Sequence, residues 1–263
     1  MHLQSRKIVL TGAGSGIGRA LLHELSKFEG VKILAVDCHE DAVQALEGKV
    51  WPYVCDISQN EALTKLFADA VSLLGGIDLF FANAGFSYYG DLGKPDWQKT
   101  QRIFATNVFS PIFILQQLLA EPKCQGFRLV ITASAMGLLP MPGYALYGAT
   151  KAAMVSFCQA MRYELPESVS LTVVYPIATR TRFFDHDGHR IPVPWPTQTP
   201  EHVARSIIKG LRGDRQDIFP SRLFRLTIFL QTYLPLIGRL YQLHARMTLF
   251  KWLKQKESSA KLE

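Results

Sequence analysis

The stretch Thr11-Gly12-Ala13-Gly14-Ser15-Gly16-Ile17-Gly18 joins a short apolar run to a helical pattern that starts at Arg19. A strand that ends in glycines and leads into a helix brings backbone N–H groups and the positive helix end to one point, which suits a pyrophosphate. The spacing G-x-G-x-x-G does not fit, because Ile17 and Arg19 stand where it requires glycine. The spacing T-G-x-x-x-G-x-G does fit and predicts a phosphate-binding turn; the alternative is a glycine-rich turn without a ligand.

Short β-branched runs alternate with helix-length segments along the chain. We expect strands at residues 7–11, 32–36, 50–54, 77–81, 127–132 and 169–175. Most of these runs lack polar alternation, which is typical of a parallel sheet covered by helices on both faces. The pattern predicts an α/β fold with a doubly wound parallel sheet, whose ligand crevice lies at the carboxyl ends of the strands.

The 263 residues are enough for one large α/β domain, and no internal repeat or second domain is indicated. We expect a catalytic domain over residues 1–220 and a helical, amphipathic C-terminal extension over 221–263. A Pro-rich stretch at 191–200 is followed by a helix pattern that Thr199 would cap. We therefore expect a substrate loop over about 182–199.

The net charge of +7 comes from one segment of the chain. Lys and Arg number 29 and Asp and Glu 22, but residues 221–256 hold seven basic residues and no acid, so the remainder balances at 22 against 22. Basic charge spread over a domain would suggest nucleic acid. In this tail, however, apolar residues greatly outnumber the charges, and we expect no nucleic-acid partner.

The tail leaves two alternatives open. Large apolar residues between basic ones, at spacings compatible with helices broken near Pro235 and Gly238, are the composition of an interfacial helix on anionic lipid. The other interpretation is that its apolar side covers the protein's own pocket or a homo-oligomer seam. The membrane-surface hypothesis concerns residues 221–256.

The chain carries no sign of export. No apolar segment of signal-peptide length precedes the first strand, and no window reaches the ~18 uninterrupted apolar residues of a spanning helix. The four cysteines, Cys38, Cys55, Cys124 and Cys158, form no C-x-x-C pair, which favours free thiols in a reducing compartment. We expect a cytoplasmic protein, peripheral on the inner face of a membrane if the tail binds lipid.

Asp37 ends the second predicted strand, nineteen residues after Gly18. A carboxylate there accepts from both hydroxyls of an adenosine ribose and repels the ~2 negative charges of a 2′-phosphate. No Lys or Arg directly follows Asp37, and Ser15 rather than a basic residue occupies the glycine turn. NAD is therefore preferred over NADP; the alternative is that Asp37 caps the next helix.

Two further groups follow strands at the same predicted edge. Asp56 and Ile57 come after the third strand, and Asn83-Ala84-Gly85 after the fourth. A cofactor would lie along these carboxyl ends. Taken alone, Asp56 could equally be a helix cap and Asn83-Ala84-Gly85 an ordinary turn.

Tyr147 and Lys151 stand four residues apart at the start of a predicted helix, so they share one helical face. An ammonium at ~4 Å contributes roughly 4 kcal/mol at an effective dielectric constant of ~20, enough to lower a phenol pKa by about three units. Tyr147 would then exchange a proton with a substrate oxygen. Ser134, at the end of the fifth strand, would donate to the same oxygen.

This ordered set of motifs resembles the short-chain dehydrogenase/reductase family, in its single-domain branch of about this length. The similarity covers residues 6–213. It implies a Rossmann-type fold and a catalytic set of Asn107, Ser134, Tyr147 and Lys151. It further implies that Lys151 lowers the Tyr147 pKa and holds the nicotinamide ribose, while Asn107 keeps a water that relays protons. The cofactor-binding positions that follow from the glycine turn, the strand ends and the resemblance are Gly12, Gly14, Ser15, Gly16, Ile17, Gly18, Asp37, Asp56, Ile57, Asn83, Ala84, Gly85, Tyr147, Lys151, Pro176 and Thr181.

Two positions depart from the family pattern. Ala82 precedes Asn83 where the family usually has a second asparagine. Ile177 follows Pro176 where the family usually has glycine, which places a bulky side chain beside the expected nicotinamide and changes the local loop.

The resemblance also indicates where substrate binds. The segments that the family uses for its substrate pocket hold Ser87, Tyr88, Tyr89, Tyr144, Phe183, Phe184 and Trp195. They predict an apolar, aromatic pocket for a lipophilic alcohol or ketone. The stretch Asp185-His186-Asp187-Gly188-His189 has no matching second half elsewhere in the chain, so we expect no metal site.

The sequence therefore predicts an NAD-dependent oxidoreductase that moves a hydride between nicotinamide and a secondary alcohol or ketone. A protein of another class is the alternative: one with this fold that senses the cofactor without turnover. By analogy with the family we expect a homo-oligomer, a dimer or a tetramer.

Overall fold

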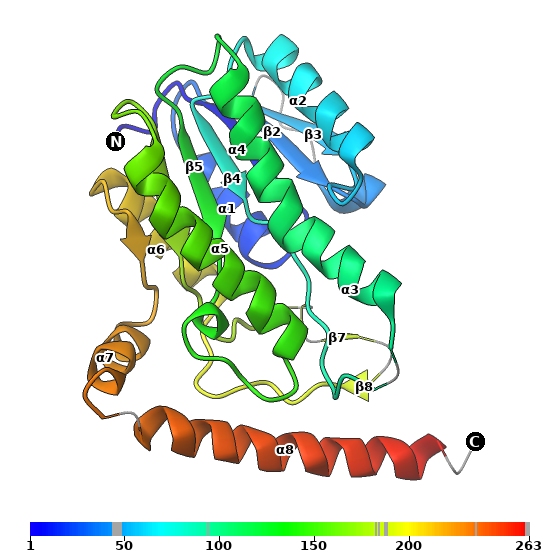
Figure 1. Ribbon diagram of the computed structural model, residues 1–263. Helices are drawn as coiled ribbons and strands as arrows, with labels where there is room; N and C mark the ends of the chain where they lie inside the picture. Colours follow the sequence, from blue (N-terminus) through cyan, green and yellow to red (C-terminus); the bar gives the residue numbers. More distant parts are fainter. Residues whose placement is uncertain are drawn as a thin grey trace.

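Seven parallel strands form one sheet in the order β3-β2-β1-β4-β5-β6-β9 (Figure 1). The computed structural model describes residues 1–43, 49–93, 95–181, 183, 185–186, 189–234 and 236–260. The strands are β1 (Lys7–Thr11), β2 (Lys32–Asp37), β3 (Val50–Val54), β4 (Leu79–Ala82), β5 (Arg128–Thr132), β6 (Ser170–Val174) and β9 (Asp217–Ile218). The strand order reverses between β1 and β4, and in a doubly wound sheet this switch point is where a ligand crevice opens.

Helices cover both faces of the sheet, as the Rossmann-type prediction requires. One face carries α1 (Gly16–Leu25) and α6 (Pro200–Arg212), which pack on each other. The other carries α2 (Asn60–Leu74), α3 (Trp97–Phe104), α4 (Ser110–Ala120) and α5 (Ala145–Glu164). Shorter turns are η1 (Glu40–Ala42), η2 (Ala105–Phe109) and η3 (Ala135–Gly137), and a two-stranded ribbon joins β7 (Asp185–His186) to β8 (His189–Arg190).

Burial of the strands explains why their sequences are apolar without alternation. Every residue of β4 and β5 is buried, and so are four of the five residues of β1. The six predicted strands are confirmed: β1 and β3 have the predicted bounds, and the ends of the other four are shifted by at most two residues. β9 was not predicted, because two residues, Asp217 and Ile218, are too few to form a pattern.

The predicted cap of α6 is present. The Thr199 side chain accepts a hydrogen bond from the backbone N–H of His202, and Pro200 opens the helix. Before this cap, the end of the Pro-rich loop pairs with the loop after β6 through an isolated bridge between Thr179 and Gln198.

The run Trp97–Ala120 is, among the described residues, the helix long and apolar enough to cross a membrane by composition. In its most apolar stretch of 18 residues, 44% of the residues are buried inside the domain, and Ile103 and Leu115 lie in the core. A buried core helix passes the same test, so no membrane span follows from it.

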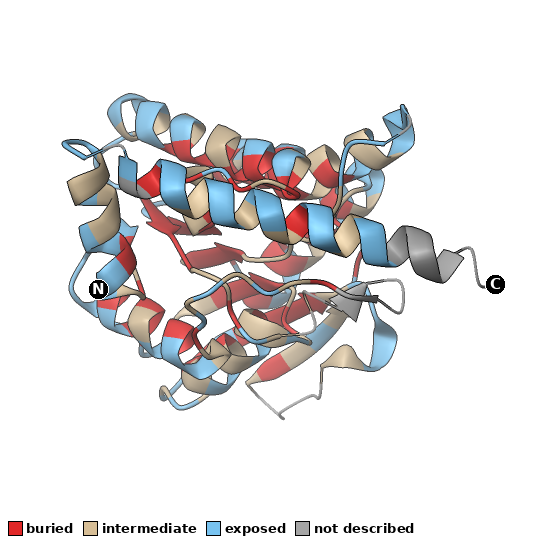
Figure 2. Ribbon diagram, turned by 90° about the horizontal axis from the view of Figure 1, so that it is seen from below, coloured by how far each residue is buried: buried red, intermediate tan, exposed pale blue. Residues whose placement is uncertain are grey.

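The tail forms two helices, α7 (Arg222–Gln231) and α8 (Leu236–Ala260), and α8 runs across one end of the domain (Figures 1 and 2). Pro235 lies outside the described residues. The expected break is present between Gln231 and Leu236, whereas Gly238 itself lies inside α8. A Cβ at Gly238 would stand 2.8 Å from the Gln231 side chain, so the glycine lets the end of α7 lie against α8.

All four cysteines are free, as expected. Cys38 is exposed, and Cys55, Cys124 and Cys158 are buried.

The tight packing of the Gly18 backbone gives a stability prediction. A Cβ at Gly18 would lie 1.8 Å from the carbonyl oxygen of Gly12. We expect Gly18→Ala to reduce the free energy of unfolding by about 1–3 kcal/mol, the usual cost of overpacking, as measured by thermal unfolding. The control is Gly148→Ala, whose Cβ would meet its nearest atom, the oxygen of Met136, at 3.5 Å. Equal losses in the two variants would contradict the prediction.

Candidate active site

A cavity of about 740 Å³ opens at the carboxyl ends of the central strands. It extends from the glycine turn and Asp37 at one end to Tyr147 and the tail helices at the other. Most of the predicted site residues line it: Gly12, Ser15, Gly16, Ile17, Asp37, Asp56, Ile57, Asn83, Ala84, Gly85, Ser134, Tyr147, Lys151, Pro176 and Thr181. Gly14, Gly18 and Asn107 do not line it, but each contacts a residue that does.

The glycine turn depends on two left-handed backbone positions. Gly12 has φ of +67° and Gly16 has φ of +50°, values that residues with a Cβ rarely adopt. Ser15 is the N-cap of α1 with an extended backbone and makes no side-chain capping bond. Because Ser15, Gly16 and Ile17 line the cavity, the positive end of α1 faces it.

Asp37 points at the glycine turn. Its Oδ2 accepts from the backbone N–H of Gly14 at 2.9 Å, and its Oδ1 from that of His39 at 3.3 Å. The alternative that Asp37 caps a helix does not hold, because His39 is the N-cap of the short η1 turn and has no side-chain capping bond. The carboxylate is therefore fixed at the cavity wall beside the turn.

Thr11 and Asn83 tie three strand ends together. The Thr11 hydroxyl donates to the oxygen of Phe81 and accepts from the backbone N–H groups of Asn83 and Ala84. The Asn83 amide donates to the oxygen of Thr11 at 3.1 Å, and its Oδ1 accepts from the Thr132 hydroxyl at 3.1 Å. Asn83 thus joins β1, β4 and β5, so its main part in the site is to position the strand ends.

The remaining cofactor-side residues are held by local turns. Asp56 accepts from the backbone N–H of Ser58 in a turn before α2, and it is not the cap, which is Gln59. The carbonyl of Pro176 accepts from the N–H of Ala135, next to Ser134. Thr181 lies against the glycine turn, since a Cβ at Gly16 would be 3.0 Å from its methyl carbon.

Tyr147 and Ser134 meet at the other end of the cavity. Tyr147 lies in the first turn of α5 and is 8% exposed; Ser134 follows β5 and is 6% exposed. Burial raises the pKa of Tyr147 to about 12, and interaction with the Ser134 hydroxyl acts in the opposite direction. The phenol is therefore held protonated and in reach of Ser134.

We expected Lys151 to lower the pKa of Tyr147, and this is wrong for the protein as the structure shows it. The Lys151 Nζ lies 5.6 Å from the centroid of the Tyr147 ring and donates to the oxygen of Thr132 at 2.8 Å. Burial lowers the pKa of Lys151 itself to about 8. Both groups are buried, and desolvation favours the neutral form of each.

Asn107 lies behind the cavity wall, in the π-helical turn η2 between α3 and α4. Its Oδ1 accepts from the N–H of Phe86, and its Nδ2 donates to the oxygen of Phe86 and the hydroxyl of Thr150. A Cβ at Gly85 would meet Asn107 Oδ1 at 2.9 Å and Lys151 Nζ at 3.4 Å. Asn107 therefore clamps the loop after β4 against the lysine.

The predicted substrate residues divide into three groups. Phe183 and Trp195 line the cavity. Ser87, Tyr88, Tyr89 and Tyr144 do not, and the expectation is wrong for these four. The half-buried Tyr89 ring packs against the buried Tyr144 ring, which in turn meets Tyr147 edge-on. Phe184 lies outside the described residues.

Other residues replace them at the substrate end, and sequence reasoning missed them. From the loop after Ser134 come Met136, Leu139 and Met141, and from the tail come Leu223, Phe224, Thr227, Gly238 and Tyr241. The apolar run after Ser134 was a usable signal. The tail residues were not predictable, because their place depends on how α7 and α8 fold back.

Ile177 lines the cavity, as its unusual position suggested. Its carbonyl accepts from the hydroxyl of Thr179 at 2.9 Å and from the Gln198 side chain at 3.4 Å. The loop after β6 is thus fastened to the Pro-rich segment and does not depend on glycine at position 177.

Among the described residues, Asp37, Cys38 and His39 place three donor atoms within 4.8 Å of one another. Cys38 and His39 are exposed, and Asp37 already accepts two backbone bonds. Exposed clusters of this kind are common without an ion, and we assign no metal to it. Of the stretch 185–189, residues 187 and 188 lie outside the described residues.

The residues present fit a nicotinamide dinucleotide. The open N-terminus of α1 suits the pyrophosphate, and the fixed carboxylate of Asp37 suits a ribose diol. Between them and Tyr147 the wall is closed by Gly85, where no side chain would fit. The volume lies within the usual range of ligand pockets, about 300–1,000 Å³.

Comparison with known proteins identifies the family. The family model described as short chain dehydrogenase matches residues 6–190. The chain is 25% identical to 17-beta-hydroxysteroid dehydrogenase 13 of Rattus norvegicus over 240 residues, which cover 87% of this chain and 79% of that protein. It is 27% identical to 3-ketodihydrosphingosine reductase of Dictyostelium discoideum over 245 residues, covering 80% and 73%.

The fold is also that of solved structures. A short chain dehydrogenase/reductase from Burkholderia phymatum in complex with NAD superposes with a TM-score of 0.78 at 22% identity, covering 89% of this chain and 95% of that one. The chain belongs to the short-chain dehydrogenase/reductase family of NAD(P)-dependent oxidoreductases.

Proposed function

We propose that this protein is an NAD-dependent oxidoreductase that moves a hydride between nicotinamide and a lipophilic secondary alcohol or ketone. One observation carries the proposal: Tyr147, Ser134 and Lys151 face the same cavity as the glycine turn and Asp37. A proton donor and a dinucleotide site in one enclosed space are what carbonyl reduction needs.

When bound, the dinucleotide supplies the hydride or accepts it. The Ser134 hydroxyl donates a hydrogen bond to the substrate oxygen and polarises the carbonyl. Tyr147, held protonated by burial, gives its proton to the same oxygen in reduction and takes it back in oxidation. Lys151 stabilises the negative charge that forms on the Tyr147 oxygen as the proton leaves.

The preference for NAD rests on Asp37. Its carboxylate is fixed by the N–H of Gly14 at the cavity wall, where it would repel a 2′-phosphate. The described residues directly after it, Cys38 and His39, include no Lys or Arg to offset that charge.

The preference for a lipophilic substrate rests on the walls beyond Tyr147. These walls are formed mainly by Met136, Met141, Phe183, Leu223 and Tyr241. Apolar walls around a few polar groups favour a substrate whose carbonyl is its main polar feature. Two relatives named for steroid and sphingosine substrates support the same class.

Tyr147→Phe is expected to reduce kcat/KM by about 10²–10⁴-fold, the usual contribution of a general acid–base. The measurement is NADH consumption with a panel of hydrophobic ketones, together with NADH binding, which should be retained. Tyr144→Phe is the matched control, because its ring stacks on Tyr147 without lining the cavity. Unchanged turnover in Tyr147→Phe would refute the assignment, and binding of NADH without turnover of any ketone by the unmodified protein would favour a cofactor sensor.

Asp37→Asn is expected to narrow the difference between NADH and NADPH. We expect the unmodified protein to bind NADH at least about tenfold more tightly, a difference of ~1.4 kcal/mol, and the variant to lose most of it. The amide keeps an acceptor for the Gly14 N–H and removes only the charge. Nucleotide fluorescence titration measures both dissociation constants, with Glu167→Gln as control, because Glu167 is exposed and does not line the cavity. Equal affinities in the unmodified protein would contradict the preference.

The rate of ketone reduction should fall as pH rises through about 8, because Lys151, with its pKa lowered to about 8, loses its charge there. Tyr147 stays protonated over this range, since its pKa is about 12. The pH profile of kcat/KM between 6 and 10 reports these groups of the free enzyme. Residual activity of Lys151→Arg should lack the inflection, and an inflection that persists in this variant would assign it to another group.

A further inference from the structure

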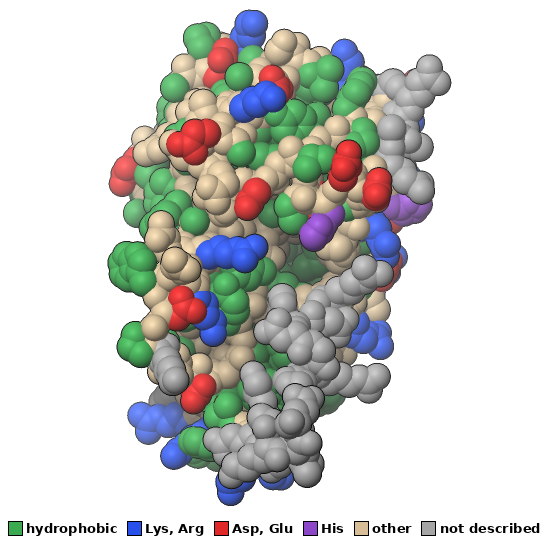
Figure 3. All heavy atoms as spheres, turned by 90° about the vertical axis from the view of Figure 1, so that its right-hand side faces the viewer, with side chains coloured by type: hydrophobic (Ala, Val, Ile, Leu, Met, Phe, Trp, Pro, Cys, Tyr) green, Lys and Arg blue, Asp and Glu red, His purple; other side chains and the backbone are tan. Residues whose placement is uncertain are grey.

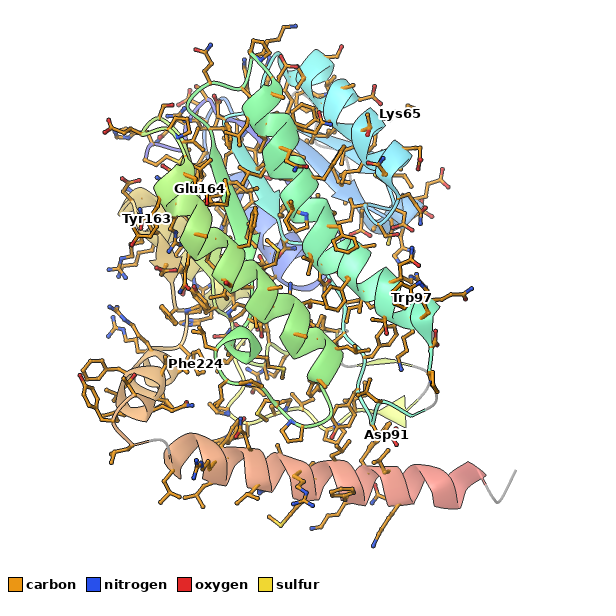
Figure 4. The ribbon with its side chains drawn as sticks, in the orientation of Figure 1. Lys65, Asp91, Trp97, Tyr163, Glu164 and Phe224 are labelled. Carbon is orange, nitrogen blue, oxygen red and sulfur yellow. The ribbon has the colours of Figure 1, made fainter. Side chains whose placement is uncertain are left out.

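The long tail helix α8 has two apolar faces on opposite sides. Tyr241, Ala245, Leu249 and Trp252 face the domain, and Leu236, Leu240, Leu243, Met247 and Phe250 are 50–62% exposed. At about 100° per residue the two sets lie roughly opposite each other. Figure 4 shows side chains leaving α8 both toward the domain and away from it.

The inner face holds α8 in place. The Tyr241 hydroxyl donates to the oxygen of Trp195 at 2.6 Å, and the Gln242 amide donates to the oxygen of Pro140 at 2.9 Å. Trp252 stacks edge-on against Tyr89, with the ring centroids 5.0 Å apart. The covering of the domain that sequence analysis left open is thus found, but it accounts for only one side of the helix.

Exposed apolar side chains are also concentrated on α7 and on its connection to α8. Ten of the nineteen large hydrophobic side chains that are exposed in the described part of the chain belong to the two tail helices and their connection. These are Leu223, Leu226, Phe229, Tyr233, Leu234, Leu236, Leu240, Leu243, Met247 and Phe250. We call this set the outer stripe. Apolar patches of this extent usually mark an interaction surface.

Basic residues flank the outer stripe. On α8, Arg239 and Arg246 lie on one flank and Lys251 on the other, all exposed. Arg246 also lies over the ring of Phe250, 5.4 Å from its centroid. Residues 221–256 contain no acid, and Figure 3 shows Lys and Arg side chains at the lower end of the molecule. Apolar side chains between exposed cations are what an interfacial helix presents to anionic lipid.

Charge decides between lipid and a second copy of this chain. A two-fold interface sets a surface against itself. Here it would bring two tails together, each with seven basic residues and no acid, and like charges oppose such pairing. An anionic bilayer satisfies both the apolar stripe and the cations.

The same helices reach the cavity. Leu223 belongs to the outer stripe, is 57% exposed and also lines the cavity. Trp195, which is outside the stripe and 77% exposed, lines the cavity as well. Phe224 points inward from α7 to the cavity wall (Figure 4). An apolar rim therefore connects the outer stripe to the space beside Tyr147.

We propose that α7 and α8 dock the protein on an anionic membrane through the outer stripe, so that a lipid substrate enters the cavity directly from the leaflet past Trp195 and Leu223. This would be the inner, cytoplasmic leaflet, where anionic lipid is concentrated. The docking is independent of the proposed function, whereas the substrate route rests on it.

Vesicle sedimentation tests the docking. The full chain should sediment with vesicles of 70% phosphatidylcholine and 30% phosphatidylserine, and at least tenfold less with phosphatidylcholine alone, since each basic residue near the surface contributes about fivefold. The triple variant Leu240→Gln, Leu243→Gln, Met247→Gln should lose binding at least tenfold. The matched control Leu73→Gln, Leu119→Gln, Tyr163→Gln changes exposed residues of α2, α4 and α5 and should bind like the unmodified protein.

Equal sedimentation of the outer-stripe variant and the unmodified protein would overturn the docking, as would no sedimentation of the unmodified protein. Analytical ultracentrifugation then identifies the other occupant: a dimer that the outer-stripe variant converts to a monomer would assign the stripe to a second copy. Circular dichroism and thermal unfolding show that each variant is folded.

Tryptophan quenching tests the route without any turnover. Phosphatidylcholine and phosphatidylserine brominated on the acyl chains should quench fluorescence of the bound protein, and Trp195→Phe should abolish most of the quenching. Docking without quenching of Trp195 would refute entry from the leaflet and leave the docking in place. Failure of the proposed function would instead appear as quenching with no turnover of any ketone.

Discussion

No side chain fits between the first turn of α1 and the end of β1. The cavity lining at the carboxyl ends of β1 and β4 depends on this contact. The Gly18 backbone lies against the carbonyl of Gly12, and Gly12 in turn lies against Ala84 after β4. The start of α1 and the segments that follow β1 and β4 are therefore in direct backbone contact. The helix can then point its first N–H groups into the cavity, and Thr11 and Asn83 complete the junction with hydrogen bonds.

At the reacting end the dominant physical effect is desolvation. Tyr147 and Lys151 are both buried: burial holds Tyr147 in its neutral, protonated form and lowers the pKa of Lys151 to about 8, so that the lysine is still charged at neutral pH. The backbone carbonyl of Thr132 and the clamp formed by Asn107 keep the lysine next to Gly85. Preorganised groups of this kind stabilise a charge that appears only during proton transfer, without having to reorganise.

The parts of the fold that the sequence predicts are those set by local pattern. Strands buried on both faces read as apolar runs, and the glycine turn, Asp37 and the Tyr147–Lys151 spacing reveal the site. The direction of the Tyr147 pKa shift was not predictable, because it depends on how deeply α5 buries both groups. The orientation of the tail was not predictable from its sequence either. Apolar residues lie on opposite sides of α8, so the periodicity does not indicate which side faces the domain. The sequence left open whether the tail covers the protein or faces outward. In α8 both are found, on two sides of one helix.

The residues that line the cavity come from two parts of the chain. Tyr147, Ser134 and the glycine turn lie inside the region that the family model matches, residues 6–190, but Leu223, Phe224 and Tyr241 lie beyond it. The substrate end of the cavity is therefore shared between two stretches of the chain: Met136, Met141 and Phe183 come from the matched region, and the other three residues come from the tail helices. Exchanging α7 and α8 between relatives would therefore replace only the tail part of this wall and leave Ser134, Tyr147 and Lys151 in place.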